Sequence, residues 1–241
     1  MSNITYVSFL ISSPTDHITT EKRLGWLNAL LELDISLILF VDTAYKKLVS
    51  SAKARIIEID FNTLETVKLI QATPNVQLPA SRNTGKDTVE FLTIMNAKPE
   101  LLKLAKPYVE TPYVAYLDAG LRKVFKSDTT LKRLETLRVH SIPLVMLPGC
   151  HLIRPHPLEE LGSRIDWTFC GGFFIVPTSK VEEFMKVHLT TLGHFLGESK
   201  LTWEVNVWTA AAPAYREKIV WFLADHNDTM ITAIPQYHLL Q

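Results

Sequence analysis

Nearly continuous apolar runs of strand length alternate along this chain with segments in which apolar residues recur every three or four positions. Such runs predict strands buried on both faces, as in parallel sheets, and the three-to-four spacing predicts helices. The predicted strands span residues 6–11, 35–41, 56–61, 112–117, 144–147 and 173–176. The predicted helices span residues 21–31, 89–108 and 179–195. This alternation is typical of the α/β class, with a mostly parallel central sheet flanked by helices.

Breaks in the pattern refine these elements. Ser12, Ser13 and Pro14 end the first strand. Pro99 marks a kink or a second helix start within 89–108, and Ser179 is a plausible N-cap of the last helix. A polar stretch runs from the third strand to about residue 86. Because no repeat and no Gly/Ser-rich linker occurs, we expect one domain over residues 1–241.

Composition limits the classes of partner. A chain of 241 residues with 47% hydrophobic content supplies a substantial core. Its 25 basic and 25 acidic residues balance, so nothing predicts nucleic-acid binding, and any anionic ligand must be held by a local site. We expect a cytoplasmic protein with at most peripheral membrane contact, because the start of the chain lacks a secretion signal and no apolar run reaches the roughly 20 residues of a membrane span.

The two cysteines, Cys150 and Cys170, have no close Cys or His spacing that would predict a zinc site, and we interpret them as reduced thiols. Three nucleotide and hydrolase motifs are also missing. S-S-P-T-D, residues 12–16, stands where a Gly-x-Gly-x-x-Gly or Walker loop would lie, and no Gly-x-Ser-x-Gly occurs. The chain therefore lacks the main sequence signatures of dinucleotide oxidoreductases, P-loop kinases and nucleophile-elbow hydrolases.

One carboxylate ends the strand at 112–117. Asp118 is followed by the small residues Ala119 and Gly120, which let a ligand approach the backbone. Ligands of open α/β sheets collect at the carboxyl ends of strands, so Asp118 is placed to reach a metal-bound diphosphate. The alternative is that Asp118 only caps the turn that follows.

Paired glycines precede the strand at 173–176. Gly171 and Gly172 either clear space for a flat ligand such as a sugar ring, or permit a bulge or a turn with positive φ.

A carboxylate lies among tryptophans at residues 203–208. On a helix, Trp203 and Val207 share one face, and Glu204 and Trp208 share the neighbouring one. A carboxylate in apolar surroundings suits proton transfer or the binding of hydroxyls. The alternative is that Glu204 points into solvent.

The apolar run at 221–224 ends in four polar residues. Asp225, His226 and Asp228 are donors suited to Mg²⁺ or Mn²⁺, and Asn227 can add an amide oxygen. A solvated turn is the alternative. Parallel strands expose such ends along one edge, so we expect His226 to lie near Asp118.

Five short motifs in this order resemble the HtrL/YibB-like family of glycosyltransferases over residues 6–231. They are N-A-K-P-E-L-L (96–102), Y-L-D-A-G (116–120), C-G-G-F-F-I (170–175), W-E-V-N-V-W (203–208) and A-D-H-N-D (224–228). The resemblance implies the GT-A, nucleotide-diphosphosugar transferase fold. It also implies transfer of a sugar from a nucleotide diphosphate donor to an acceptor hydroxyl, in surface glycan or glycoconjugate synthesis.

The resemblance assigns roles to residues. Asp118 would bind Mn²⁺ or Mg²⁺ bridged to the diphosphate, although Gly120 stands where the second carboxylate of an Asp-x-Asp motif would be. His226 with Asp225 or Asp228 would complete the metal shell. Glu204 would deprotonate the acceptor. The remaining residues implied in nucleotide-sugar binding are Asp42 at the base or ribose, Lys98 and Arg122 at the diphosphate, and Gly171, Gly172 and Asn206.

Two other functions use the same residues. A metal-dependent phosphohydrolase or nucleotidyltransferase would need carboxylates that hold two metals about 4 Å apart. A non-catalytic nucleotide-sugar-binding protein on the same scaffold is the other, and Gly120 is the residue that favours it.

Overall fold

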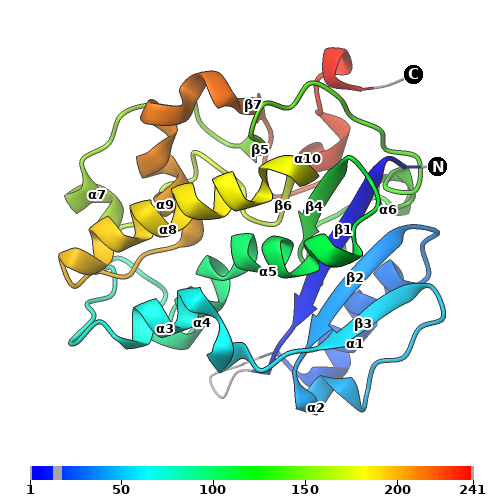
Figure 1. The fold of residues 1–241 in the computed structure, drawn as a ribbon, viewed down its shortest axis with the longest axis horizontal. Coiled ribbons are helices and arrows are strands. Elements are labelled where there is room, and N and C mark those ends of the chain that lie inside the picture. Colours follow the sequence, from blue (N-terminus) through cyan, green and yellow to red (C-terminus); the bar gives the residue numbers. More distant parts are fainter. Residues whose placement is uncertain (1, 13–17, 240–241) are drawn as a thin grey trace.

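The computed structural model describes residues 2–12 and 18–239 (Figure 1). Within these residues seven strands form one sheet, in the order β3-β2-β1-β4-β6-β5-β7. The strands are β1 (Ile4–Leu10), β2 (Ser36–Val41), β3 (Ala54–Glu58), β4 (Tyr113–Leu117), β5 (Val145–Gly149), β6 (Phe173–Pro177) and β7 (Ile219–Leu223). Strand β6 is antiparallel to both β4 and β5, and the other pairings are parallel. The predicted α/β class with a mostly parallel sheet is confirmed.

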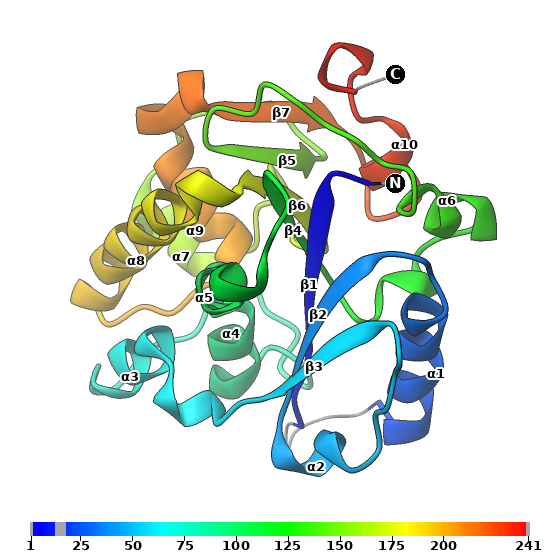
Figure 2. The same ribbon diagram turned by 45° about the vertical axis from the view of Figure 1, so that its right-hand side comes forward.

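Helices cover both faces of the sheet (Figure 2). Helices α3, α4, α5, α8 and α9 lie on one side, and α1, α6 and α10 lie on the other. The helices are α1 (Thr20–Leu31), α2 (Thr43–Lys46), α3 (Glu65–Gln71), α4 (Val89–Asn96), α5 (Lys98–Ala105), α6 (Asp128–Arg133), α7 (Leu158–Ser163), α8 (Val181–Gly197), α9 (Glu204–Ala211) and α10 (Thr229–Thr232).

Two hydrophobic layers explain why the strand sequences are apolar throughout. On β4, Val114 and Tyr116 belong to the core beneath α5 and α8, whereas Ala115 and Leu117 belong to the core on the opposite face. Every residue of β1 is buried for the same reason. A strand covered on both sides has no polar face, so its sequence shows no alternation.

Most predicted elements are confirmed, and four details are corrected. The strand predicted over 56–61 is β3, which ends at Glu58, because Phe61 begins a 3-10 turn. The helical pattern of 89–108 is two helices, because α5 begins at Lys98 with Pro99 in its first turn. Ser179 is not an N-cap: it lies inside a short 3-10 turn, and α8 starts at Val181 without a side-chain cap. The polar stretch before residue 86 contains α3, whose Val67 and Ile70 are buried.

One predicted break cannot be compared with the structure, and the helices show no membrane-spanning segment among the described residues. The predicted break at Ser13 and Pro14 lies outside the described residues, as do positions 15 and 16 of the S-S-P-T-D segment. Among the helices described, none has the length and apolar character needed to cross a membrane.

Candidate functional site

A cavity of about 620 Å³ opens at the carboxyl ends of β1 and β4. Leu10 and Ile11 line it from the end of β1, and Asp118 and Ala119 line it from the end of β4. Strand β1 has β2 as its neighbour on one side and β4 on the other. The first three strands follow one another in one direction along the sheet and β4 lies in the opposite direction, so the strand order reverses here. Open α/β sheets bind ligands at this kind of position.

Asp118 both caps a turn and lines this cavity. Its Oδ1 accepts a hydrogen bond from the Gly120 N–H at 2.7 Å, and its own N–H donates to the Gly172 carbonyl at 2.9 Å. Within the described residues, Asp118 Oδ2 accepts no hydrogen bond. The capping and ligand-binding interpretations are therefore compatible, because each uses a different oxygen.

Lys123 is a basic residue that lines the cavity beside Asp118. The predicted residue, Arg122, lies in the same 3-10 turn, η3 (Leu121–Lys123). Arg122 instead donates to the Asp128 carboxylate at 2.6 Å and to the Phe125 carbonyl at 3.2 Å, and it does not line the cavity. Lys123 Nζ lies 5.4 Å from the centre of the Trp26 ring, and both side chains line the cavity wall.

A buried ion pair forms the back of the cavity. Lys98 Nζ lies 2.5 Å from Glu204 Oε1 and donates to the Gly171 carbonyl at 3.0 Å. The two side chains are only 3% and 5% exposed. Tyr116 lies below, with its ring centre 5.1 Å from Lys98 Nζ, and burial together with the charges of Asp118 and Glu204 raises the pKa of Tyr116. Lys98 is thus neutralised by the protein rather than presented to a ligand, and Glu204 does not point into solvent.

The paired glycines make room for neighbouring side chains. A Cβ at position 171 would lie 2.1 Å from Glu204 Oε1, and one at position 172 would lie 3.2 Å from Leu121 Cδ1. Neither glycine has a positive φ, so a left-handed turn is not the reason for them. Both still line the cavity. Gly171 is required because the carboxylate of the ion pair occupies the space of its side chain.

Asn206 and Trp208 are buried residues of α9, and neither lines the cavity. Asn206 Nδ2 donates to the carbonyls of Leu161 and Arg164 at 2.6 and 2.7 Å, and its Oδ1 accepts from the Asp166 N–H at 2.8 Å. These bonds hold the end of α7 and the three residues after it against α9. Trp208 packs against Phe174 and Phe184. Of the aromatic residues in W-E-V-N-V-W, only Trp203 lines the cavity.

The polar side chains of the 224–228 loop have different surroundings. Asp228 accepts backbone N–H groups of Lys126 and Ser127 at 2.8 and 3.2 Å. The Asp225 side chain is 71% exposed. His226 lines the same cavity as Asp118, with the Trp167 ring edge-on at 4.4 Å between centroids. The two loops thus meet at one cavity, but Asp225 and Asp228 do not line it.

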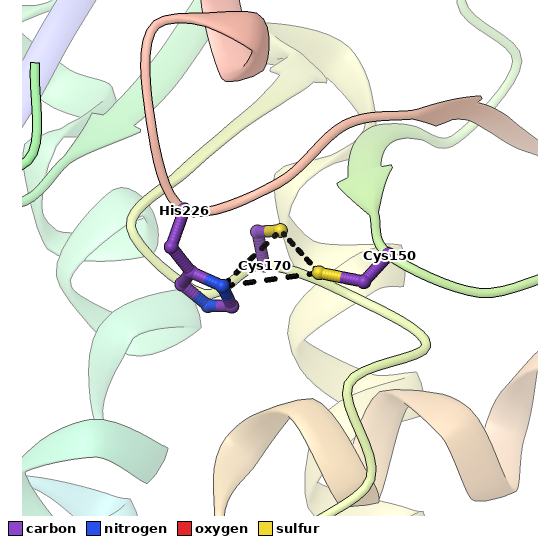
Figure 3. Close-up of side chains that lie close together, drawn as sticks. All are labelled: Cys150, Cys170 and His226. Atoms are coloured by element: carbon purple, nitrogen blue, oxygen red, sulfur yellow. Dashed lines mark hydrogen bonds between the residues drawn. The ribbon is translucent and has the colours of Figure 1, made fainter. Parts of the chain in front are cut away.

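Two thiols and an imidazole lie together beside this loop (Figure 3). Cys150 Sγ is 3.7 Å from Cys170 Sγ and 3.8 Å from His226 Nδ1, and Cys170 Sγ is 4.0 Å from that nitrogen. Burial raises the pKa of both thiols and lowers the pKa of His226. The sequence spacing predicted no metal cluster here. The three side chains are nevertheless close together, because the sheet brings together residues that are far apart in the chain.

Asp42 lies at a second, adjoining cavity of about 780 Å³. It caps α2, because its Oδ1 accepts from the Tyr45 N–H at 2.9 Å, and its Oδ2 accepts from the Ser12 N–H at 2.7 Å and from the Ser12 hydroxyl. Ile11 and Ile94 line both cavities. Asp42 is therefore separated from Asp118 by this shared apolar boundary.

Sequence reasoning missed several residues that line the first cavity. Trp26 and Trp167 add aromatic surface to it, and the Trp167 side chain is 38% exposed. Lys86 and Asp87 add charge, and the Lys86 ammonium lies 4.7 Å from the Phe91 ring centre. No local signal marks these residues, because they come from three separate segments that only the fold brings to the cavity.

Comparison with protein families finds none whose sequence pattern matches the chain, and no curated protein matches it either. Among solved structures, the fold is similar to that of a glycosyltransferase involved in the glycosylation of the major capsid of PBCV-1. The TM-score is 0.44 and the sequence identity 11%, over 92% of this chain and 81% of that one. A likeness of this size assigns no activity to the chain. The resemblance to the HtrL/YibB-like family stays a prediction.

Proposed function

We propose that this protein is a glycosyltransferase that moves a sugar from a nucleotide diphosphate donor to an acceptor hydroxyl. The observation that supports this most is the cavity of about 620 Å³ at the point where strand order reverses, with the Asp118 carboxylate at its rim. Cavities of this size hold small-molecule ligands, and this position in an α/β sheet is used for nucleotides. A GT-A classification, a hexosyl donor and a part in surface glycan synthesis are finer proposals that rest on the sequence resemblance.

The donor set at Asp118 fits a hard divalent cation held together with a diphosphate. Mg²⁺ is usually bound through one or two carboxylates, substrate phosphates and water, so a single carboxylate oxygen such as Asp118 Oδ2 is enough on the protein side. When bound, the cation would offset the charge that develops on the leaving nucleoside diphosphate. Lys123 would act on the same charge from the cavity wall. Asp225 and Asp228 do not line the cavity and take no part in this proposal.

The acceptor half of the cavity is proposed to lie between Glu204 and Trp167. Both residues line the cavity, and an exposed indole ring suits the apolar face of a pyranose. Glu204 would receive the proton of the acceptor hydroxyl as general base. Lys98 is a positioning residue here, because its bond to Glu204 Oε1 fixes the carboxylate in one orientation.

The first experiment measures thermal stability with UDP, GDP or inorganic phosphate, each with and without Mn²⁺. Stabilisation by one of the nucleoside diphosphates that grows with Mn²⁺ supports the proposal, because a ligand that binds only the folded state raises Tm by mass action. Incubation with the corresponding sugar nucleotides then tests for release of the nucleoside diphosphate. If the protein binds the sugar nucleotide but releases no nucleoside diphosphate even at high protein concentration, it is a nucleotide-sugar-binding protein and not an enzyme.

The phosphohydrolase alternative finds less support. A two-metal site needs several carboxylates placed to hold two metals about 4 Å apart. Among the described residues, Cys150, Cys170 and His226 form a group whose ligand atoms lie within 4.8 Å of one another, and this group contains no carboxylate. Stabilisation by phosphate rather than by a nucleoside diphosphate would reverse this preference.

A further inference from the structure

Three strand ends bring Cys150, Cys170 and His226 to one place, which we call the thiol–imidazole cluster. Cys150 follows β5 directly, His226 follows β7, and Cys170 precedes β6. Strand β5 is parallel to β7 and antiparallel to β6, so the end of β5, the end of β7 and the start of β6 share one edge of the sheet. Backbone bonds fix this arrangement: the Cys170 N–H donates to the Pro148 carbonyl and the Ala224 N–H to the Gly149 carbonyl, each at 2.8 Å.

The distances within the cluster match the edges of a tetrahedral zinc shell. Zinc binds thiolate at about 2.3 Å and imidazole at about 2.0–2.1 Å, which places two sulfurs about 3.8 Å apart and a sulfur and a nitrogen about 3.6 Å apart. The two Sγ atoms are 3.7 Å apart, and they lie 3.8 and 4.0 Å from His226 Nδ1. The three side chains point toward one another, with the two sulfurs and the imidazole nitrogen at the centre (Figure 3).

Asp225 places a fourth donor close to two of these three atoms. Its Oδ1 lies 3.7 Å from Cys150 Sγ and 3.6 Å from His226 Nδ1. Carboxylate oxygen is an accepted zinc ligand at about 2.0–2.2 Å, alongside sulfur and nitrogen. The five distances among the four donor atoms other than that between Asp225 Oδ1 and Cys170 Sγ span 3.6 to 4.0 Å.

We propose that the thiol–imidazole cluster binds one zinc ion, with Asp225 as the fourth ligand. Binding releases the two thiol protons to solvent and changes no oxidation state. Thiolate and imidazole donors select zinc over the hard cations that suit Asp118 and a diphosphate. The site therefore differs from the proposed catalytic cation and does not depend on the proposed function. By tying the 224–228 loop to β5 and to the segment before Gly171, the ion would fix one border of the cavity.

Cobalt substitution tests the site on the whole chain without any activity measurement. The reduced protein is dialysed against a chelator and titrated with Co²⁺, whose absorption reports both geometry and thiolate ligation. We expect one equivalent to produce the intense visible bands of tetrahedral cobalt and a near-ultraviolet thiolate-to-cobalt band, and Zn²⁺ to displace it. Zinc should also protect both cysteines from alkylation.

Variants identify the ligands. His226→Gln and Cys150→Ser should each weaken Co²⁺ binding by about 100-fold or more, since loss of even an outer partner costs 10–100-fold. Asp225→Asn should weaken binding while the thiolate band remains. His194→Gln is the matched control, because His194 is exposed on α8 away from the cluster. Asp118→Asn should leave the cobalt spectrum unchanged, which separates this site from the proposed catalytic one.

Three results would overturn the proposal. One is an octahedral cobalt spectrum that lacks the thiolate band. Another is unchanged Co²⁺ affinity in both His226→Gln and Cys150→Ser. The third is quantitative oxidation of Cys150 and Cys170 to a disulfide in the presence of excess zinc, since bound zinc would hold both thiolates.

Discussion

The rim and the back of the cavity hold their charges in opposite ways. At the rim, Asp118 uses one oxygen to cap its turn, and Lys123 faces the cavity with an aromatic neighbour but no carboxylate partner among the described ion pairs. At the back, Lys98 and Glu204 are buried and bonded to each other. The Lys98 ammonium and Glu204 Oε1 are therefore satisfied within the fold, whereas the partly open charges of the rim are available to a ligand. Position in a cavity alone does not distinguish the two.

The largest expected effect is on folding, at the back of the cavity. Glu204→Gln leaves the Lys98 ammonium buried without its counter-charge, so the free energy of unfolding should fall by about 3–5 kcal/mol. The matched change at the rim, Asp118→Asn, should stay within about 1 kcal/mol, because an amide oxygen can still accept the Gly120 N–H. Urea denaturation of both variants measures the difference.

The double variant Lys98→Met/Glu204→Gln separates folding from chemistry. Removing both charges should restore most of the lost stability. If Glu204 is the general base, transfer should remain about 100-fold below wild type in this folded protein. Equal stability losses at Glu204 and Asp118 would contradict the division between rim and back.

The second prediction concerns ligand affinity at the rim. Asp118→Asn should reduce the affinity for a nucleoside diphosphate in the presence of Mn²⁺ by about 100-fold or more, because it removes a direct ligand of the cation. The affinity without Mn²⁺ should change little. Calorimetric titration with and without Mn²⁺ measures both. Equal affinity of variant and wild type under both conditions would leave Asp118 with its capping role alone.

A third prediction concerns the layer behind the ion pair. His188 is fully buried on α8 and receives a hydrogen bond from Trp208 Nε1 at 3.1 Å. Burial lowers the pKa of His188 from 6.5 to about 3. Below pH 6.5 the unfolded chain therefore binds a proton that the native chain does not, and stability falls with acidification by roughly 1 kcal/mol per pH unit.

His188→Gln should flatten this slope between pH 6.5 and 5, even though the variant starts from lower stability. His194→Gln, on the exposed side of the same helix, should keep the slope of the wild type. Unfolding free energies from urea titrations across this pH range provide the test. An unchanged slope in His188→Gln would assign the acid sensitivity to other groups.

The smallest expected effect distinguishes two neighbours in one turn. Lys123→Gln should weaken nucleoside diphosphate binding about fivefold, equivalent to about 1 kcal/mol, the upper range for an exposed charge contact. Arg122→Gln should leave binding unchanged, because Arg122 contacts Asp128 and the Phe125 carbonyl instead. The opposite ranking in the same titration would return the diphosphate contact to Arg122.

Local patterns predicted the strands that are buried on both faces, because such burial leaves a continuous apolar run. The end of β3, which is only partly buried, was misplaced by three residues. The same patterns placed Asp118 and His226 at strand ends that do meet at one cavity. The direction of β6 could not be predicted, since a fully buried five-residue run reads the same in a parallel or antiparallel pairing.

Contacts between side chains that lie far apart in sequence could not be predicted either. Lys98 and Glu204 are 106 positions apart, and neither motif indicates the other. Arg122 and Lys123 are neighbours in a 3-10 turn. The ion pair of Arg122 with Asp128 holds Arg122 away from the cavity, and the sequence does not indicate this contact. The thiol–imidazole cluster depends on the order of β6, β5 and β7, which no local spacing encodes.

The place of β6 in the sheet also sets an order of assembly. Strands β3, β2, β1 and β4 are adjacent and all come from the first 117 residues, so they can pair while the rest of the chain is still being synthesised. Strand β5 comes next in sequence but has no neighbour in that block. It joins the sheet only through β6, which lies between β4 and β5. The C-terminal half of the cavity therefore completes only after β6 has left the ribosome, and a nascent chain that stops before it exposes an unpaired edge at β4.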